Sequence, residues 1–189
     1  MATGATVHHG AAEIDLREER TADIAAIASV HLQAFGGDAE ARLVEQLRHD
    51  GDVIVSLVAT RGERVVGHVL FSRLPIVTGI GHLPAAALAP VAVLPAWQNR
   101  EIGSALVRKG LAACRDRAID AVVVLGHPPY YARFGFSAEL AERLVAPYSG
   151  AAFMAVELVP GALAFGSGTA NYPPAFAFVS ASAPSSGPT

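Results

Sequence analysis

Hydrophobic positions along the chain follow two periods, one typical of amphipathic helices and one typical of strands. Apolar residues recur every three or four positions in three segments, which predicts helices at residues 21–35, 38–50 and 102–117. Alternating, β-branched or continuously apolar segments predict strands at residues 13–17, 53–60, 64–72, 88–94, 121–125 and 153–158. Between them we expect a hairpin turn at residues 61–63, a loop at 75–87 and one helical turn at 129–133.

The fold class follows from how these elements alternate. Residues 121–125 are five consecutive apolar residues, which is typical of a strand buried on both faces. Together with the strand at 88–94 and the helix at 102–117, this strand forms a β–α–β unit, which requires a parallel strand pair. The hairpin adds antiparallel strands. We therefore expect an α/β fold of the mixed α+β kind, with a central mixed β-sheet flanked by helices.

The C-terminal segment differs in composition from the rest of the chain. Residues 160–189 contain no charged side chain. Phe165, Tyr172, Phe176 and Phe178 lie in the first part, which we expect to pack on the domain. The remainder is Ser, Pro, Ala and Gly, which is typical of disorder. The expected organisation is a flexible N-terminus at 1–12, one domain at 13–159, a packed aromatic extension at 160–179 and a disordered tail at 180–189.

Composition and charge exclude several classes of protein. A net charge of −3 gives no basic surface for nucleic acid. Hydrophobic residues make up 52% of the chain, but no long uncharged run has the density of large apolar side chains that a membrane span needs. The first ten residues lack the pattern of a secretory signal, and the single cysteine, Cys114, fits a reducing compartment. We expect a cytoplasmic protein with no membrane partner and no metal site, and a homodimer remains open.

Candidate chemistry is concentrated in residues 88–106, where a buried strand runs through a proline and a polar turn into a helix. The first amides of a helix lack intrahelical partners and attract anions, so this turn could hold a phosphate. An ordinary strand-to-helix connection explains the pattern equally well. Gly103-Ser104 lacks the lysine and glycine spacing of a P-loop, and no Gly-x-Gly-x-x-Gly is present, which argues against a nicotinamide cofactor.

Two short motifs extend this interpretation. Residues 98–104 are Gln-Asn-Arg-Glu-Ile-Gly-Ser, and residues 131–136 are Tyr-Ala-Arg-Phe-Gly-Phe. They resemble the acetyl-CoA motif Q/R-x-x-G-x-G/A and the Tyr-x-x-x-Gly-Phe segment of the GNAT N-acetyltransferases. Leu-Gly-His-Pro at 125–128 and Tyr-Pro-Pro-Ala-Phe at 172–176 are similar to a bacterial subgroup of that family. The resemblance covers roughly residues 13–178.

The resemblance implies a GNAT-like fold and the transfer of an acetyl group from acetyl-CoA, as co-substrate, to an amine acceptor. It assigns cofactor binding to Val91, Ala92, Val93, Gln98, Asn99, Arg100, Glu101, Ile102, Gly103 and Ser104. Tyr131 would be the general acid beside the thioester sulfur, although a packing role for this aromatic residue stays open. His127 is the candidate general base, and a loop histidine bonded to backbone is an equally good interpretation. Acceptor pockets in this fold are built mainly by the first two helices and variable loops, here residues 21–50 and 75–87.

One residue departs from the family motif. Glu101 stands where the motif has its first glycine, a residue that lets backbone approach a phosphate closely. A glutamate there adds bulk and negative charge beside an anion. The sequence therefore keeps three functions open: an active N-acetyltransferase, a non-catalytic acyl-CoA-binding or regulatory module, and an interaction domain that uses the uncharged tail.

Overall fold

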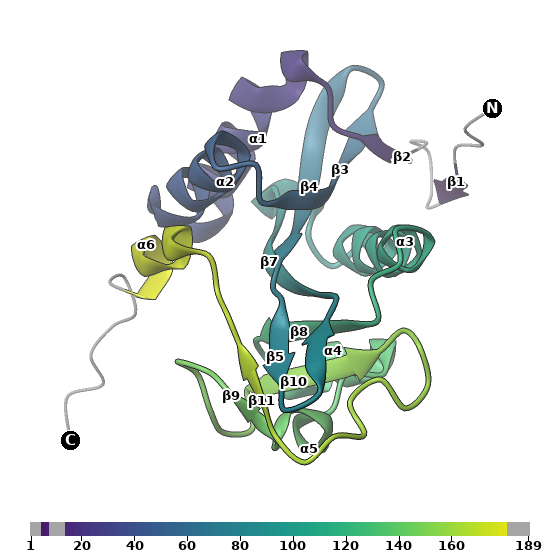
Figure 1. Ribbon diagram of the computed structural model, residues 1–189. Coiled ribbons are helices and arrows are strands. Elements are labelled where there is room, and N and C mark those ends of the chain that lie inside the picture. The colour runs from purple at the N-terminus through teal and green to yellow at the C-terminus, as the bar shows by residue number, and fades with distance from the viewer. Residues whose placement is uncertain (1–4, 8–13, 181–189) are drawn as a thin grey trace, which may run out of the picture.

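The computed structural model describes residues 5–7 and 14–180 of the 189-residue chain (Figure 1). The tail expected to be disordered lies outside the described residues except for Ser180, and so does the expected flexible N-terminus except for residues 5–7. Residues 5–7 form β1 (Ala5–Val7), which pairs antiparallel with β2 (Ile14–Glu18) at the edge of the main sheet.

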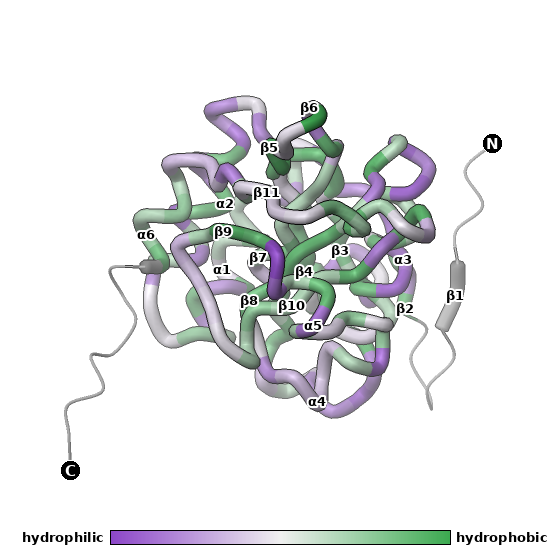
Figure 2. The backbone as a smooth tube through the Cα atoms, turned by 60° about the horizontal axis from the view of Figure 1, so that its bottom comes forward, coloured by the Kyte–Doolittle hydropathy of each residue, from purple (hydrophilic) through white to green (hydrophobic). Residues whose placement is uncertain are grey.

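The main sheet has seven strands in the order β1-β2-β3-β4-β7-β8-β10. The strands after β2 are β3 (Val53–Arg61), β4 (Arg64–Arg73), β7 (Ala85–Val93), β8 (Ala121–Leu125) and β10 (Phe153–Glu157). Neighbours pair antiparallel, except β7 and β8, which pair parallel as the β–α–β unit requires. The expected mixed sheet is confirmed, and its central strands are the main hydrophobic part of the trace (Figure 2).

Helices cover both faces of this sheet (Figure 1). The first two are α1 (Ile24–Phe35), entered through the 3-10 turn η1 (Thr21–Asp23), and α2 (Ala39–His49), and the third is α3 (Ile102–Asp116). Successive residues of a strand point to opposite faces. On β4, His68 reaches His31 of α1, whereas a side chain at Gly67 would meet Leu106 of α3. The sheet therefore separates the α1–α2 layer from α3.

A second, four-stranded sheet corrects two expectations, the loop at residues 75–87 and the strand at 153–158 as the last strand. Its order is β6-β5-β11-β9, with β5 (Ile76–Thr78), β6 (Gly81–Leu83), β9 (Leu144–Val145) and β11 (Gly168–Ala170). The expected loop contains β5, β6 and the first residues of β7. β5 and β6 form a short antiparallel hairpin, and β5 also pairs with β11 from the C-terminal segment, a long-range contact that joins the hairpin to the second sheet.

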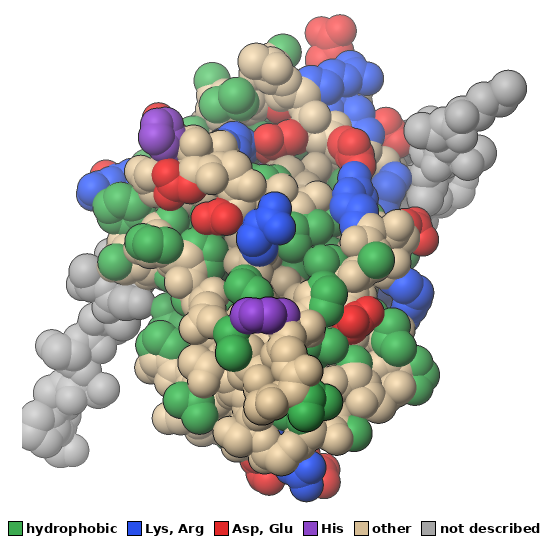
Figure 3. Space-filling view, in the orientation of Figure 1, with side chains coloured by type: hydrophobic (Ala, Val, Ile, Leu, Met, Phe, Trp, Pro, Cys, Tyr) green, Lys and Arg blue, Asp and Glu red, His purple; other side chains and the backbone are tan. Residues whose placement is uncertain are grey.

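Residues of the C-terminal segment lie against the domain. Leu163, Ala175 and Phe176 are buried, and the Tyr172 ring packs edge-on against Tyr148 and Phe176, with centroids 5.1 and 4.9 Å apart. The segment ends in η4 (Pro174–Phe176) and α6 (Ala177–Ser180), which lies beside α2. Charged side chains gather over α1, α2, α3 and the adjoining strands, whereas the surface over β5, β9 and β11 carries few of them (Figure 3).

The short helices between β8 and β10 complete the fold. They are α4 (Pro128–Tyr131), η3 (Ala132–Phe134) and α5 (Ala138–Ala141). The first of them contains most of the helical turn expected at 129–133. Leu125, at the end of β8, is 49% exposed, so the strand expected to be buried on both faces is open at its last residue.

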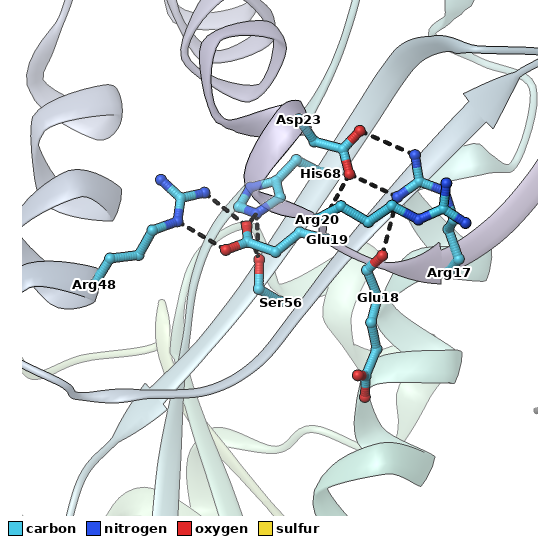
Figure 4. A network of polar contacts seen from close by, with 8 residues as sticks. All are labelled: Arg17, Glu18, Glu19, Arg20, Asp23, Arg48, Ser56 and His68. Carbon is cyan, nitrogen blue, oxygen red and sulfur yellow. Dashed lines mark hydrogen bonds and ion pairs between the residues drawn. The ribbon is translucent and has the colours of Figure 1, made fainter.

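A buried polar network joins the α1–α2 layer to the sheet (Figure 4). The rings of His31 and His68 are both fully buried and share a hydrogen bond of 2.8 Å. His68 also contacts the Ser56 hydroxyl at 2.8 Å, and Ser56 donates to Glu19 at 2.5 Å. Arg48 of α2 binds the Glu19 carboxylate through two hydrogen bonds of 2.8 and 2.6 Å. The chain of contacts thus runs from the partly exposed ion pair of Arg48 and Glu19 to the buried ring of His31.

The network holds both histidines neutral. Burial lowers the pKa of His31 to about 3, and the nearby His68 and Arg48 add to the effect. Burial also lowers the pKa of His68, against the opposing influence of the Glu19 carboxylate. Burial raises the pKa of Glu19, but hydrogen bonds from Arg48, His68 and Ser56 outweigh it, so this pKa lies below its usual value. The network therefore stabilises the fold only while the imidazoles are uncharged.

We predict that acid weakens the fold through His31. Below the unfolded pKa of about 6.5, the unfolded chain binds a proton at this residue and the folded chain does not, so stability falls as pH drops toward about 3. Between pH 7.5 and pH 5 the loss from this group is about 2 kcal/mol at 1.36 kcal/mol per pH unit. Urea unfolding of His31→Gln should show a pH dependence smaller by that amount. His82→Gln, at an exposed position of β6, is the matched control, and equal slopes in both variants would contradict the prediction.

Candidate functional site

The site begins where β7 separates from β8. The two strands pair only from Ala85 to Ala87, opposite residues 121–123 of β8. Beyond Ala87, β7 stays paired with β4 on one edge, with a register shift between Val69 and Phe71, and no strand in the described part of the chain pairs with its other edge. The backbone of the following residues therefore has donors and acceptors available for another extended partner.

The first of two pockets lies beside this open edge and has a volume of about 560 Å³. Nine of the ten residues that the family resemblance assigns to the cofactor line it: Val91, Ala92, Val93, Gln98, Asn99, Glu101, Ile102, Gly103 and Ser104. Arg100 does not line it, and its guanidinium stacks on the Trp97 ring at 5.1 Å instead. Trp97, Pro129, Tyr130 and Arg133 complete the wall.

The turn between β7 and α3 is held in an unusual conformation. Asn99 and Glu101 both have left-handed backbone, with φ of 59° and 58°, which costs a residue with a side chain about 1–2 kcal/mol. The 3-10 turn η2 (Pro95–Trp97) precedes them. The side-chain amide of Gln98 donates a hydrogen bond of 3.0 Å to the Val93 carbonyl, which connects the turn to the end of β7. Glycine suits position 101 for this conformational reason as well as for the close approach of a phosphate.

The first amides of α3 face an ion pair. Glu101 lies 3.4 Å from Arg133, and Arg133 donates to the Ser104 hydroxyl at 2.8 Å. A hydrogen bond with Ser104 and the charge of Arg133 lower the pKa of Glu101, so its carboxylate is ionised at neutral pH. Both charged side chains are exposed, and such pairs contribute only about 0–1 kcal/mol. A bound anion could therefore take Arg133 from Glu101 at little cost.

A second pocket, also of about 560 Å³, lies on the α1–α2 side of the site. Val91 lines both pockets, so they meet on β7. Tyr131 and His127, the two residues predicted to be catalytic, both line the second pocket. The expected α1–α2 segment contributes Phe35, Glu40 and Leu43, but the expected segment 75–87 contributes Ala87 alone. The C-terminal segment, which was not expected here, adds Tyr172, Phe176 and Val179.

The two adjacent tyrosines face different pockets. Tyr131 is buried and its ring covers Gly126, where a Cβ atom would lie 2.3 Å from a ring carbon, so a larger residue would displace the ring. Burial raises the pKa of Tyr131 to about 12, and Tyr130 adds to the effect. Tyr130 lines the first pocket, and its hydroxyl lies beside Gly103. Burial also raises the pKa of Tyr130, against an opposing hydrogen bond with Ser104. His127 is exposed at the start of α4.

Sequence analysis missed Arg133 and Glu40 as site residues. Arg133 lies inside the Tyr-x-x-x-Gly-Phe segment at a position that the motif leaves free, and Glu40 is one of several acidic residues on an amphipathic helix. Only the tertiary structure brings each of them to a pocket. Among the residues that the structure describes, no three His, Cys, Asp or Glu side chains gather to hold a metal ion. No described helix is long and apolar enough to span a membrane.

Comparisons with known proteins agree with this geometry. Residues 15–138 match the family described as acetyltransferase (GNAT) domain. The uncharacterized N-acetyltransferase YjhQ of Escherichia coli is 36% identical over 133 residues, which are 69% of this chain and 71% of that protein. YhbS of Escherichia coli, another uncharacterized N-acetyltransferase, is 38% identical over 122 residues, 64% of this chain and 72% of its own.

Solved structures give the same result. The crystal structure of YhbS from Escherichia coli in complex with CoA superposes with a TM-score of 0.81 at 33% identity, covering 90% of this chain and 96% of that one. A GNAT family acetyltransferase from Brucella melitensis in complex with acetyl-CoA has a TM-score of 0.71 at 33% identity, covering 86% and 97%. With its mixed sheet, its divergent strand pair and these relatives, this chain belongs to the GNAT family of acetyltransferases.

Proposed function

We propose that this protein transfers an acetyl group from acetyl-CoA to a primary amine by direct attack, with acetyl-CoA in the first pocket and the amine in the second. The observation that carries the proposal is the meeting of the two pockets at Val91, on the unpaired edge of β7. Relatives at 33% identity are solved with CoA and with acetyl-CoA, which supports the same co-substrate here.

The cofactor would bind in two parts. The amide groups of its pantetheine arm would pair with the backbone of Val91 to Val93, as an added strand pairs with a sheet edge. Its pyrophosphate would accept hydrogen bonds from the first amides of α3, at Ile102 to Ser104, where the helix dipole also favours an anion. Arg133 would add a positive charge. This arrangement directs the thioester toward Val91 and the second pocket.

The chemistry needs the amine nitrogen to lose a proton and the negative charge on the departing sulfur to be stabilised. The amine nitrogen attacks the thioester carbonyl carbon, the carbon–sulfur bond breaks, and the sulfur leaves with the bonding electrons. At a pKa of about 12, Tyr131 stays protonated at neutral pH and can donate a hydrogen bond to that sulfur. A thiol has a pKa of about 8.5, so complete transfer from this phenol would be unfavourable, and we assign Tyr131 the role of hydrogen-bond donor to the developing thiolate. His127 would accept the proton that the amine releases, directly or through water.

We also propose that the protein works in the cytoplasm. The support is Cys114, the single cysteine, which is a buried free thiol in α3. Burial raises the pKa of this thiol to about 12, so it stays protonated and unreactive. A chain with no pair of cysteines has no need of an oxidising compartment.

Two measurements on the full chain test the function. Isothermal titration should detect acetyl-CoA binding at one site, and a thiol-release assay should detect CoA only when a suitable amine is added. Binding without amine-dependent release, over a broad panel of amines, would favour the non-catalytic acyl-CoA-binding module. Absence of binding would leave only an interaction domain built on this fold.

We predict that Tyr131→Phe lowers turnover by roughly 10²-fold, the scale for loss of one preorganised hydrogen-bond donor to developing negative charge, because the departing sulfur loses that donor. The dissociation constant of acetyl-CoA should hardly change, since Tyr131 lines the second pocket. Tyr130→Phe is the matched control, because its hydroxyl lies in the first pocket and its loss should mainly affect cofactor binding. Equal turnover in Tyr131→Phe and the unmodified protein would refute the assignment.

We predict that Glu101→Gly tightens CoA binding by roughly 5- to 30-fold. At about 6 Å and an effective dielectric of about 20–40, one repulsive charge pair costs about 1.5–3 kcal/mol, and the substitution also releases Arg133 for the phosphates. Effects on the free protein should nearly cancel, because relief of the left-handed backbone offsets the loss of a carboxylate at the helix start. If only the loss of the carboxylate counted, Glu101→Gly would slightly destabilise the free protein. The left-handed backbone at residue 101 offsets that loss.

The variant Glu101→Gln separates charge from backbone conformation. It removes the carboxylate but keeps a side chain at φ 58°. If repulsion is the cause, Glu101→Gln should recover most of the gain, and the gain should shrink as salt rises. A gain seen only with glycine would place the cause in the backbone, and unchanged affinity in both variants at low salt would show that Glu101 does not oppose the cofactor.

A further inference from the structure

The walls of the second pocket are mostly apolar and come from four parts of the chain: the helices α1 and α2, the divergent strands, the segment between β8 and β10, and the C-terminal segment. α1 and α2 supply Phe35 and Leu43, the divergent strands supply small and branched aliphatic side chains, and the C-terminal segment supplies Tyr172 and Phe176. The Tyr172 ring is packed between Tyr148 and Phe176, with edge-on contacts at 5.1 and 4.9 Å. Burial raises the pKa of Tyr172, so its hydroxyl stays neutral. This wall is an aromatic surface without charge.

Glu40 is the one carboxylate in the lining of the second pocket. It is the one Asp, Glu, Lys or Arg among the residues that line the pocket, and its side chain is half-buried. Within the described part of the chain, its carboxylate has no hydrogen bond or ion pair. Arg42, two residues later on α2, stacks instead on the Phe178 ring at 4.6 Å and does not line the pocket. A negative charge against an apolar wall is costly unless a cation pairs with it.

On the basis of the proposed acetyl transfer, we infer that the acceptor is a small monoamine with an aromatic or branched aliphatic body. Its ammonium group would pair with Glu40, and its body would lie against Phe35 and the Tyr172–Phe176 wall. A primary amine with a pKa near 10.4 is protonated at neutral pH, so this carboxylate meets the form present in solution. A volume of about 560 Å³ suits a small molecule, since such pockets span about 300–1,000 Å³.

The same lining argues against other amines. A polyamine or an aminosugar carries several cationic groups, and the lining offers no carboxylate besides Glu40 to replace the water that these groups would lose. One carboxylate can neutralise only one of those charges. His127 lines the same pocket and is exposed, so it could take the proton that the ammonium must lose before attack, release it to water, and then accept the second proton as the amide forms. Binding by Glu40 and deprotonation are therefore separate steps carried out in one pocket.

The test compares amines and variants at saturating acetyl-CoA. The amines are 2-phenylethylamine, isopentylamine, spermidine and a lysine-containing peptide. We expect kcat/KM for 2-phenylethylamine to exceed that for spermidine at least about tenfold, because only its body fits the wall. Glu40→Gln should lower kcat/KM for 2-phenylethylamine roughly 10- to 100-fold, mostly through KM, as expected for loss of a hydrogen bond to a charged group. Glu45→Gln, at an exposed site on the same helix that does not line the pocket, is the matched control.

A binding measurement separates this inference from the proposed function. Isothermal titration of 2-phenylethylamine into protein saturated with CoA requires no turnover. Binding that Glu40→Gln weakens and Glu45→Gln does not would support the pocket assignment even if no amine were acetylated, in which case only the proposed acetyl transfer would fail. Preferential acetylation of spermidine or of the peptide would overturn the inference, as would amine binding that is absent or indifferent to Glu40.

Discussion

Unsatisfied backbone on β7 is the constraint around which the site is arranged. After pairing with β8 as far as Ala87, the strand continues beside β4 with its second edge open. Peptide N–H and C=O groups need partners, and water or an extended ligand must supply them here. The divergence also creates the space for two pockets, which meet at Val91. One topological feature thus provides both the binding groups and the volume for two substrates.

The two pockets use charge in opposite ways. In the first, the amides of α3 and the guanidinium of Arg133 attract an anion, and Glu101 partly cancels that attraction. In the second, one carboxylate at Glu40 stands against an apolar wall and attracts a cation. A coenzyme with phosphates and a protonated amine therefore prefer different pockets. In the proposed reaction, this separation would let the coenzyme and the amine meet at β7, where Val91 lines both pockets.

The strand–turn–helix from β7 to α3 and the segment after β8 could be predicted from sequence because their signals are local. Nine predicted cofactor residues line one pocket for the same reason: they follow one another along a strand and a turn. Arg100 does not line it, since its side chain stacks on Trp97. The expected loop at 75–87 was wrong because it contains the short β5–β6 hairpin, whose strand β5 also pairs with β11, some ninety residues away along the chain. The neighbouring residues in the sequence do not identify Glu40 or Arg133 as site residues. Glu40 lies on an amphipathic helix and Arg133 at a free position of the motif, and only the tertiary structure places them in a pocket.

The amine side of the site depends on a network that contacts neither substrate. His31 stacks against Phe35, whose ring lines the second pocket, with ring centroids 5.9 Å apart. The same imidazole is hydrogen-bonded to His68 of β4, and Glu19 links that strand to Arg48 of α2. The helices α1 and α2 are therefore both connected to the sheet by contacts that require neutral His31 and His68 and an ionised Glu19. The first pocket depends less on protonation, because its ion pair of Glu101 with Arg133 is exposed and contributes only about 0–1 kcal/mol. As the pH falls, the contacts that hold α1 and α2 beside the second pocket should therefore weaken before the turn between β7 and α3 changes.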